Sequence, residues 1–304
     1  MNASQALGYN SIGSSYHSVH ALFGYTACMG TSSVAFVLLA AAAAGSYDTS
    51  IQEWRERREA ALKADDGWLT VAGLFWLKEG DNTAGSAASS DIRLERGPAK
   101  IGVFQHHVAT TIFQPAAGVR IDAPAGELRP DTGLIRFDDY TMFVIHRGER
   151  DAIRLKDKRS KFRREFTGLH WYPVNPDYRV VAKFVSYKKP TLIAIPNILG
   201  EVEKEPSAGY AEFDLRGQHY RLEPVLEDSQ LFYIFRDLTS GKETYGAGRF
   251  LYSDMPRDGT VVLDFNKAYN PPCAFTPYAT CPLPPAQNRL AVRLEAGERK
   301  YGDH

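Results

Sequence analysis

Polar side chains gather near the C-terminus in a pattern that could bind an anionic or polar ligand. Tyr245 and Arg249 are four residues apart on one expected strand, so they share a face of it. Asp264 and Asn266 share a face of the next expected strand for the same reason. An arginine, an aspartate and several amides around one loop can together bind a carboxylate, a phosphate or a sugar. The ligand site that we predict consists of Tyr245, Arg249, Asp264, Asn266, Tyr269, Asn270 and Asn288.

Arg249 is the expected anion partner in this site. If its strand pairs with the next one as a hairpin across residues 254–259, Arg249 approaches Asp264, which would orient it or the ligand. A hydrolase-type enzyme is an alternative, in which Asp264 works with Tyr245 or His170 as its acid–base partner. The sequence contains no G-x-S-x-G, P-loop, G-x-G-x-x-G or H-E-x-x-H motif, so it leaves open whether the protein is an enzyme.

The loop that carries part of this site is unusually constrained. Residues 270–288 include six prolines and two cysteines. Each proline fixes φ and removes a backbone donor, which predicts a rigid, irregular loop. Such stiffness serves recognition by preorganising a site. It would equally suit a loop that closes one end of a β domain, with the polar residues satisfying backbone groups that the prolines leave unpaired. A structural or assembly protein is therefore a further alternative, and it would show a large exposed apolar patch.

Two of the three cysteines, Cys273 and Cys281, lie in this loop, and the third is Cys28. In an exported chain that has lost Cys28, such a pair predicts a disulfide, which would stabilise the fold by roughly 2–3 kcal/mol. The alternative is two buried free thiols. No histidine or further cysteine lies at ligand spacing nearby, so we expect no metal site and no cofactor.

The N-terminus differs in composition from the rest of the chain. Residues 1–47 contain no Asp, Glu, Lys or Arg, and 34–44 form a compact apolar run with small residues at its end. We interpret residues 1–45 as a signal peptide, although it lacks a basic start, and we expect export to the periplasm, the cell envelope or the medium. A membrane anchor over 19–45 is the alternative.

The remaining chain predicts a mainly β protein, made of antiparallel sandwich or barrel units with one N-terminal helix. Short apolar segments recur between turn residues at the spacing of such folds. The helix is expected over 50–63, where Ser50 and Glu53 form a capping box. Lys plus Arg and Asp plus Glu each number 36, a balance that argues against a nucleic-acid partner.

Two β domains follow the leader in our interpretation. The first, 46–158, contains the helix and a sandwich-like set of strands. The second, 159–304, carries the loop with its prolines and cysteines, and a basic run with two prolines after it marks the boundary. We expect the partner to be a small polar or anionic ligand, and we expect no nucleic-acid partner.

Several strings resemble one known family. They are VVLDFNKAYNPPCAFTPYATCPLPPAQNRL at 261–290, GWLTVAGLFWLKEGDNTAGS at 67–86, FTGLHWYPVNPDYRV at 166–180 and IAIPNILG at 193–200. They resemble the bacterial and archaeal family called domain of unknown function 1684, over roughly residues 48–301. The resemblance implies no established activity, substrate or catalytic residue.

A second and weaker resemblance concerns the start of the first β domain. The string NTAGSAASSDIRL at 82–94 is similar to the first turn of forkhead-associated sandwiches. Those domains bind phosphothreonine through an arginine after the glycine and a later Ser-x-x-His. Here Ser86 follows Gly85 and no Ser-x-x-His comes after it, so the resemblance implies the fold and not that function.

Overall fold

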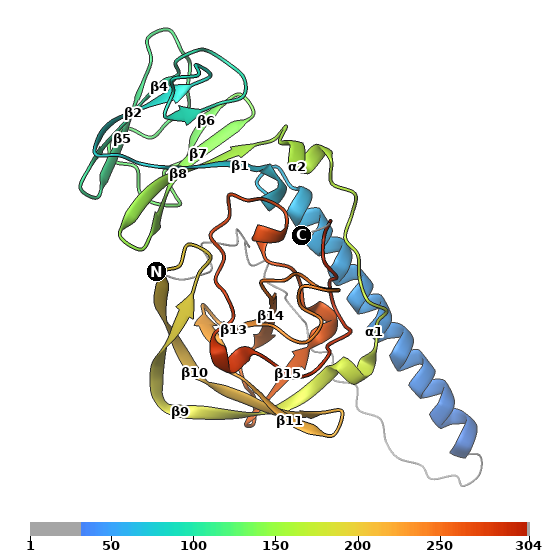
Figure 1. Ribbon diagram of the computed structural model, residues 1–304. Helices are drawn as coiled ribbons and strands as arrows, with labels where there is room; N and C mark the ends of the chain where they lie inside the picture. Colours follow the sequence, from blue (N-terminus) through green and yellow to red (C-terminus); the bar gives the residue numbers. More distant parts are fainter. Residues whose placement is uncertain (1–31, 303–304) are drawn as a thin grey trace, which may run out of the picture.

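A computed structural model of the chain describes residues 32–302, with side chains from residue 45 onward. Two β units are stacked end to end, and one long helix runs along the side of the second (Figure 1). The prediction of a mainly β fold with one N-terminal helix is confirmed. Each of the four sheets built from the described residues is open, so none of them closes into a barrel.

The first unit is a sandwich of two four-stranded sheets, with strand orders β1-β8-β7-β6 and β3-β2-β4-β5. The strands are β1 (Val71–Trp76), β2 (Gly80–Gly85), β3 (Ile92–Arg93), β4 (Gly102–His107), β5 (Thr110–Pro115), β6 (Ile135–Phe137), β7 (Tyr140–Arg147) and β8 (Arg150–Asp157). Only β2 and β3 pair in parallel. Buried side chains from both sheets, including Phe104 and Ile153, form its core.

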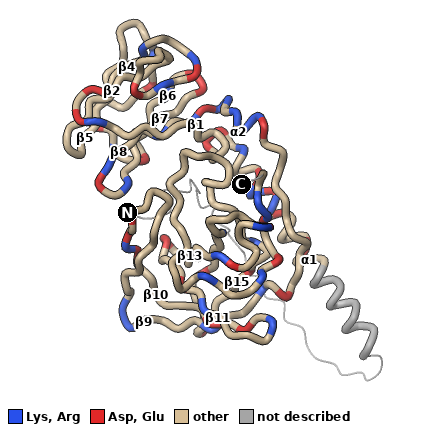
Figure 2. Tube along the Cα trace, in the orientation of Figure 1, with Lys and Arg blue, Asp and Glu red and all other residues tan. Residues whose placement is uncertain are grey.

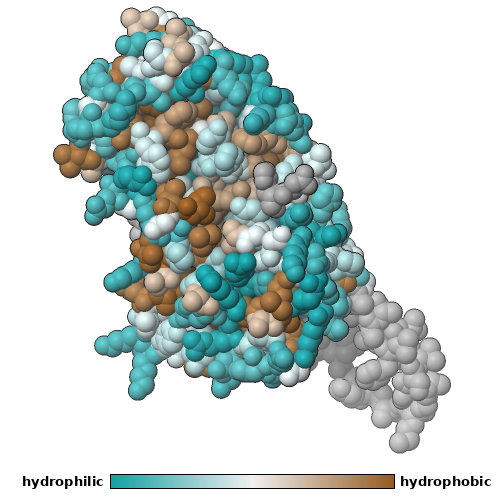
Figure 3. Space-filling view, viewed as in Figure 1, coloured by the Kyte–Doolittle hydropathy of each residue, from teal (hydrophilic) through white to brown (hydrophobic). Residues whose placement is uncertain are grey.

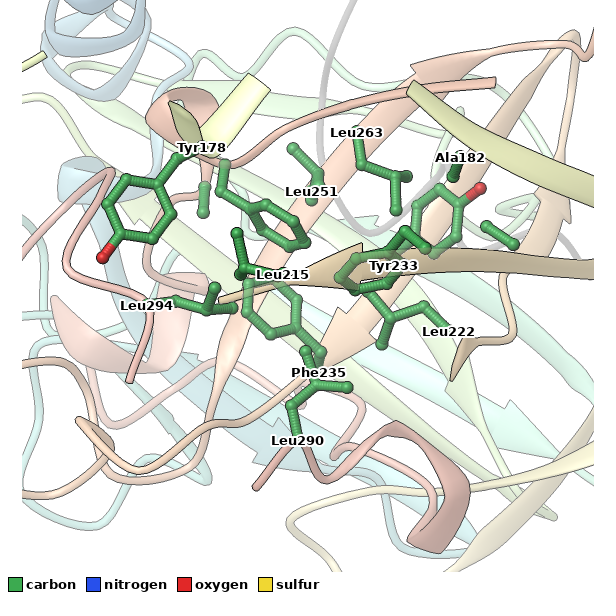
Figure 4. Close-up of a cluster of buried hydrophobic side chains, with 14 of the residues drawn as sticks. Tyr178, Ala182, Leu215, Leu222, Tyr233, Phe235, Leu251, Leu263, Leu290 and Leu294 are labelled. Atoms are coloured by element: carbon green, nitrogen blue, oxygen red, sulfur yellow. The ribbon is translucent and has the colours of Figure 1, made fainter. Parts of the chain in front are cut away.

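The second unit has a four-stranded sheet of order β11-β10-β9-β15 and a three-stranded sheet of order β12-β13-β14. The strands are β9 (Arg179–Pro196), β10 (Val202–Leu215), β11 (Gln218–Leu222), β12 (Val225–Glu227), β13 (Gln230–Phe235), β14 (Arg249–Asp254) and β15 (Thr260–Asp264). Tyr233 and Phe235 project from β13 into the core between these sheets (Figure 4). Leu231 of the same strand belongs to this core as well.

Short helical turns connect the strands. They are η2 (Trp68–Thr70), α2 (Lys161–Arg164), η3 (Pro176–Tyr178), η4 (Phe265–Lys267), η5 (Pro272–Ala274) and η6 (Ala286–Asn288). The prolines of residues 270–288 thus shape two single 3₁₀ turns within an otherwise irregular segment. We call this segment the Pro/Cys loop.

The long helix α1 (Ser32–Lys63) ends where the sequence predicts and begins much earlier. The predicted start at Ser50 is wrong, because the preceding alanines favour helix and carry it through this residue. The Ser50 hydroxyl does not cap the helix but donates to the Tyr47 carbonyl, one turn earlier. Among the described helices, none is long and apolar enough to cross a membrane. Residues 1–31, which contain most of the predicted leader, lie outside the described part of the chain.

α1 contacts the second unit through several side chains and also packs against η2. Trp54 packs edge-on against Trp171, with ring centroids 5.7 Å apart, and Arg58 donates to the Asn270 carbonyl at 2.9 Å. The predicted domain boundary at residue 158 stays a prediction. Acidic and basic residues are interspersed along both units, in keeping with the formal net charge of zero (Figure 2).

Candidate functional site

Arg249 is fully buried, and its guanidinium already has a carboxylate counter-ion within the protein. It donates to Asp237 at 2.8 Å and to the Leu294 carbonyl at 3.0 Å, and it also donates to the Ala296 carbonyl. The expected approach of Arg249 to Asp264 is wrong. The two strands do not form a hairpin, because β14 pairs with β13 while β15 pairs with β9 in the other sheet.

Asp264 and Asn266 hold α1 and the chain before β9 in place. Asp264 accepts a hydrogen bond from the Tyr47 hydroxyl at 2.8 Å and one from the backbone N–H of Asn266 at 3.2 Å. The Asn266 side chain accepts from the Asn175 N–H at 3.0 Å and donates to the Asn175 carbonyl at 2.8 Å. Within residues 45–302, no hydrogen bond joins Asp264 to Tyr245 or His170, and His170 is exposed.

The other predicted amides also serve the backbone. Asn288 donates to the carbonyls of Glu223 and Ile234 and accepts from the Glu223 N–H, all within 3.0 Å. Asn270 donates to the Arg299 carbonyl at 2.7 Å. Tyr269 is buried beneath α1, where the Arg58 guanidinium lies 4.5 Å from its ring centroid. Side chains used in this way stabilise an irregular loop, and the ligand role predicted for them stays a prediction.

Tyr245 lies elsewhere, beside the two cysteines of the Pro/Cys loop. Burial, together with the nearby thiols of Cys273 and Cys281, raises the pKa of Tyr245 to about 12. Its ring packs with a hydrophobic cluster that includes Leu62 and Phe275. Arg154, described below, acts electrostatically on both of these thiols.

Strand β8 brings a row of basic residues to the face of its sheet that meets the second unit. Arg150, Arg154 and Lys156 share this face because side chains alternate along a strand. Arg147 of β7 lies opposite Arg150 in the register, so it joins the same face. Arg150 has a counter-ion, Glu201, at 2.9 Å.

Arg147 and Arg154 instead converge on one neutral group, the hydroxyl of Thr280 in the Pro/Cys loop. The distances from Thr280 Oγ1 are 2.9 Å to Arg147 Nε and 3.5 Å to Arg154 Nη2. Arg147 also donates to the His146 carbonyl at 2.6 Å. Neither guanidinium forms an ion pair with a carboxylate of the described residues. We call Arg147, Arg154 and Thr280 the arginine site.

Arg154 is a buried cation without a carboxylate partner among the described residues. Its residue is only 2% exposed, and its Nε has no hydrogen-bond partner. Burial, and after it the neighbouring charge of Arg147, lower the pKa of Arg154 to about 10, while Asp131 acts in the opposite direction. A guanidinium that loses its hydration without gaining an ion pair is costly to keep.

Asp131 is the acidic group that acts on both arginines. Its backbone is left-handed, with φ 61°, and its N–H donates to the Val144 carbonyl at 2.8 Å. One carboxylate oxygen, Oδ1, is buried without a partner. Burial raises the pKa of Asp131, and the two arginines lower it. Asp131 and the arginines therefore attract one another without direct contact.

The two cysteines border the arginine site. Cys281 follows Thr280 directly and is buried, while Cys273 is half-buried, and both are free thiols. The Cys273 N–H points at Cys281 Sγ from 3.2 Å. A hydrogen bond with the Cys281 side chain lowers the pKa of the Cys273 thiol, and Arg154 adds to the effect. Burial, followed by the interaction with Cys273, raises the pKa of the Cys281 thiol.

Part of the chain is similar to known proteins. Residues 164–299 match the family model described as "Protein of unknown function (DUF1684)". An uncharacterized protein of Haloarcula marismortui, solved in solution by NMR, is 33% identical over 45% of this chain and 78% of its own, with a TM-score of 0.39. The chain belongs to the DUF1684 family. No curated protein matches it.

The segment that matches the DUF1684 model supplies only one of the three residues of the arginine site. Thr280 and both thiols lie within residues 164–299, whereas Arg147 and Arg154 precede them. The sequence singled out the Pro/Cys loop as part of a site, but we did not predict Arg147 and Arg154 from it. The signal available was the recurrence of basic residues at alternate positions of one strand, Arg150, Arg154 and Lys156, which places them on one face.

Proposed function

We propose that this protein binds a small anion at the arginine site, between the β1-β8-β7-β6 sheet and the Pro/Cys loop. One observation carries the proposal: Arg154 is buried without a carboxylate partner among the described residues. Removing a cation from water costs several kcal/mol unless an anion compensates it. A bound anion would supply that compensation and would accept the hydrogen bond that Arg154 Nε lacks.

The two guanidiniums restrict the class of ligand. A guanidinium offers a planar fork of donors that matches carboxylate, phosphate and sulfate oxygens. Asp131 lies near enough to interact electrostatically with both arginines. Its carboxylate would repel an anion that carries excess charge, and it would accept a hydrogen bond from a donor group on the ligand. A compact mono- or dianion with a hydroxyl or amino group fits this set best.

We propose further that residues 1–45 act as a signal peptide for export. In the oxidising compartment that the protein then enters, Cys273 and Cys281 form a disulfide. The uncharged, apolar leader supports export, and the 3.2 Å contact between the Cys273 N–H and Cys281 Sγ supports the pairing. Quantitative thiol labelling of protein recovered from the exported fraction tests it. Two free thiols in native exported protein would overturn the disulfide.

The ligand proposal is tested by thermal unfolding in the presence of phosphate, sulfate, acetate and citrate at constant ionic strength. A ligand at a hundred times its dissociation constant should stabilise the protein by about 2.7 kcal/mol. The effect should vanish in Arg154→Met and persist in Arg150→Met, whose side chain lies on the same sheet face but has its own counter-ion. Equal stabilisation of all three proteins would contradict the arginine site.

A further inference from the structure

We propose that Cys273 and Cys281 undergo thiol–disulfide exchange with an anionic disulfide, whose acidic group binds Arg147 and Arg154. This inference rests on the proposed anion site and specifies its ligand as a disulfide that carries a carboxylate or a similar anion. It assigns to the Pro/Cys loop a redox reaction, and it assigns to the neighbouring arginines the recognition of the substrate.

The geometry of the loop brings the two thiols together. Cys273 lies in η5 and Cys281 lies eight residues later, yet the Cys273 N–H reaches Cys281 Sγ at 3.2 Å. Both side chains belong to one hydrophobic cluster, in which Trp68 is a neighbour. The Arg154 guanidinium lies 5.1 Å from the centre of the Trp68 ring, so the arginine and the thiols share this contact.

The two cysteines differ in a way that assigns their roles. Cys273 is half-buried, whereas Cys281 is only 5% exposed, so Cys273 is the more accessible of the two. The thiolate is the attacking form in exchange, and a neighbouring thiol that donates a hydrogen bond favours it. Cys273 is therefore the attacking residue, and the buried Cys281 is the residue that resolves the mixed disulfide.

The reaction balances in two steps. The Cys273 thiolate attacks one sulfur of R–S–S–R, a Cys273–S–S–R bond forms, and RS⁻ leaves. Cys281 then loses its proton to a departing thiolate and attacks Cys273 Sγ, which displaces the second RS⁻ and forms the Cys273–Cys281 bond. The protein loses two electrons, and the external disulfide gains them and leaves as one thiol and one thiolate.

The position of the arginines explains why the disulfide should be anionic. Both guanidiniums bind Thr280 Oγ1, and Thr280 directly precedes Cys281. An acidic group held there lies one residue from the resolving cysteine. Positive charge at this point also stabilises the departing RS⁻, because thiolates leave more readily when their charge is compensated.

The test compares two disulfides that react with reduced protein in a Cys28→Ser background, which leaves only the loop cysteines. The probes are 5,5′-dithiobis(2-nitrobenzoate), which carries two carboxylates, and 4,4′-dipyridyl disulfide, which is neutral at pH 7. Loss of one charge-assisted contact corresponds to about tenfold in rate. Arg154→Met should therefore slow the anionic probe about tenfold or more and change the neutral probe little. Arg150→Met should leave the ratio of the two rates unchanged.

The order of the cysteines is tested with the same anionic probe. Cys281→Ser should release one equivalent of thionitrobenzoate and keep the other as a mixed disulfide visible by mass, whereas Cys273→Ser should react far more slowly. Unchanged probe selectivity in Arg154→Met, or a fast reaction of Cys273→Ser, would overturn the inference. If phosphate still stabilises the wild type in that case, the anion site stands alone; if it does not, both proposals fail.

Discussion

Arg249 and Arg154 are both buried arginines, and their environments predict opposite responses to substitution. Arg249 has a carboxylate partner, Asp237, at 2.8 Å, and neither side chain has exposed surface. Arg154 has no such partner among the described residues. Arg249 therefore stabilises the fold through its ion pair, whereas Arg154 is a buried charge without an ion-pair partner among the described residues.

Replacing Arg249 by Met should lower the free energy of unfolding by about 3–5 kcal/mol, because Asp237 would remain buried without its counter-ion. Urea unfolding measures the loss. The double variant Arg249→Met/Asp237→Leu should recover part of it, since the unpaired charge is then gone. A loss below about 1 kcal/mol together with weaker ligand binding would show that Arg249 belongs to a ligand site, as the sequence suggested.

Glu298 makes stability depend on pH. Burial raises its pKa to about 7 from an ordinary value of 4.5, while Arg58, whose Nε lies 3.6 Å away, acts against the shift. The folded protein therefore binds a proton that the unfolded chain releases above pH 4.5. This contribution to stability is complete below about pH 4.5 and is lost as the pH rises to about 7.

The predicted result is a free energy of unfolding that declines from about pH 4.5 to about pH 7. Glu298→Gln should remove part of the decline, because an amide does not titrate. Glu227, whose pKa burial also raises to about 7, supplies another part and gives a second variant, Glu227→Gln. A decline of unchanged size in Glu298→Gln would contradict the assignment.

At the scale of elements, the sequence shows which segments form strands and helices and says little about their partners. Alternating apolar residues identified β14 and β15 as strands. Such a pattern does not say which strand each one pairs with, so their places in two different sheets could not be predicted. The end of α1 was predictable from Asp66-Gly67. Its start was not, because Ser50 has a capping side chain but lies within a run that favours helix.

Gly45, within α1, and Gly67, which follows the end of α1, give a matched test of how the local backbone restricts substitution. A Cβ on Gly67 would lie 2.3 Å from the Leu62 carbonyl oxygen, so Gly67→Ala should destabilise the protein by about 1–3 kcal/mol. A Cβ on Gly45 meets nothing within 4 Å, and Gly45 is helical, so Gly45→Ala should stabilise by about 0.5–1 kcal/mol. Thermal unfolding of the full chain distinguishes them; destabilisation by both would contradict this description of the helix.

At the scale of the molecule, the arginine site exists only where the two units meet. Besides the bonds from Arg147 and Arg154 to Thr280, the Thr276 hydroxyl donates to the Val71 carbonyl at 2.9 Å. One of the largest apolar areas on the visible face also lies at this junction (Figure 3). The Pro/Cys loop could be recognised from its prolines and cysteines. Its partners could not, because more than 120 residues separate Arg154 from Thr280 in the chain.

The most direct measurement of the anion site follows the side-chain Nε–H resonances of arginine by NMR during a phosphate titration. Arg154 and Arg249 both have a buried Nε without a hydrogen-bond partner, so Arg249 is an internal control. An anion in the arginine site would accept from Arg154 Nε–H, shift its proton downfield and slow its exchange with water. We predict a saturable shift of the Arg154 resonance with no change at Arg249. An Arg154 resonance that stays in place up to high phosphate, or that moves together with Arg249, would contradict it.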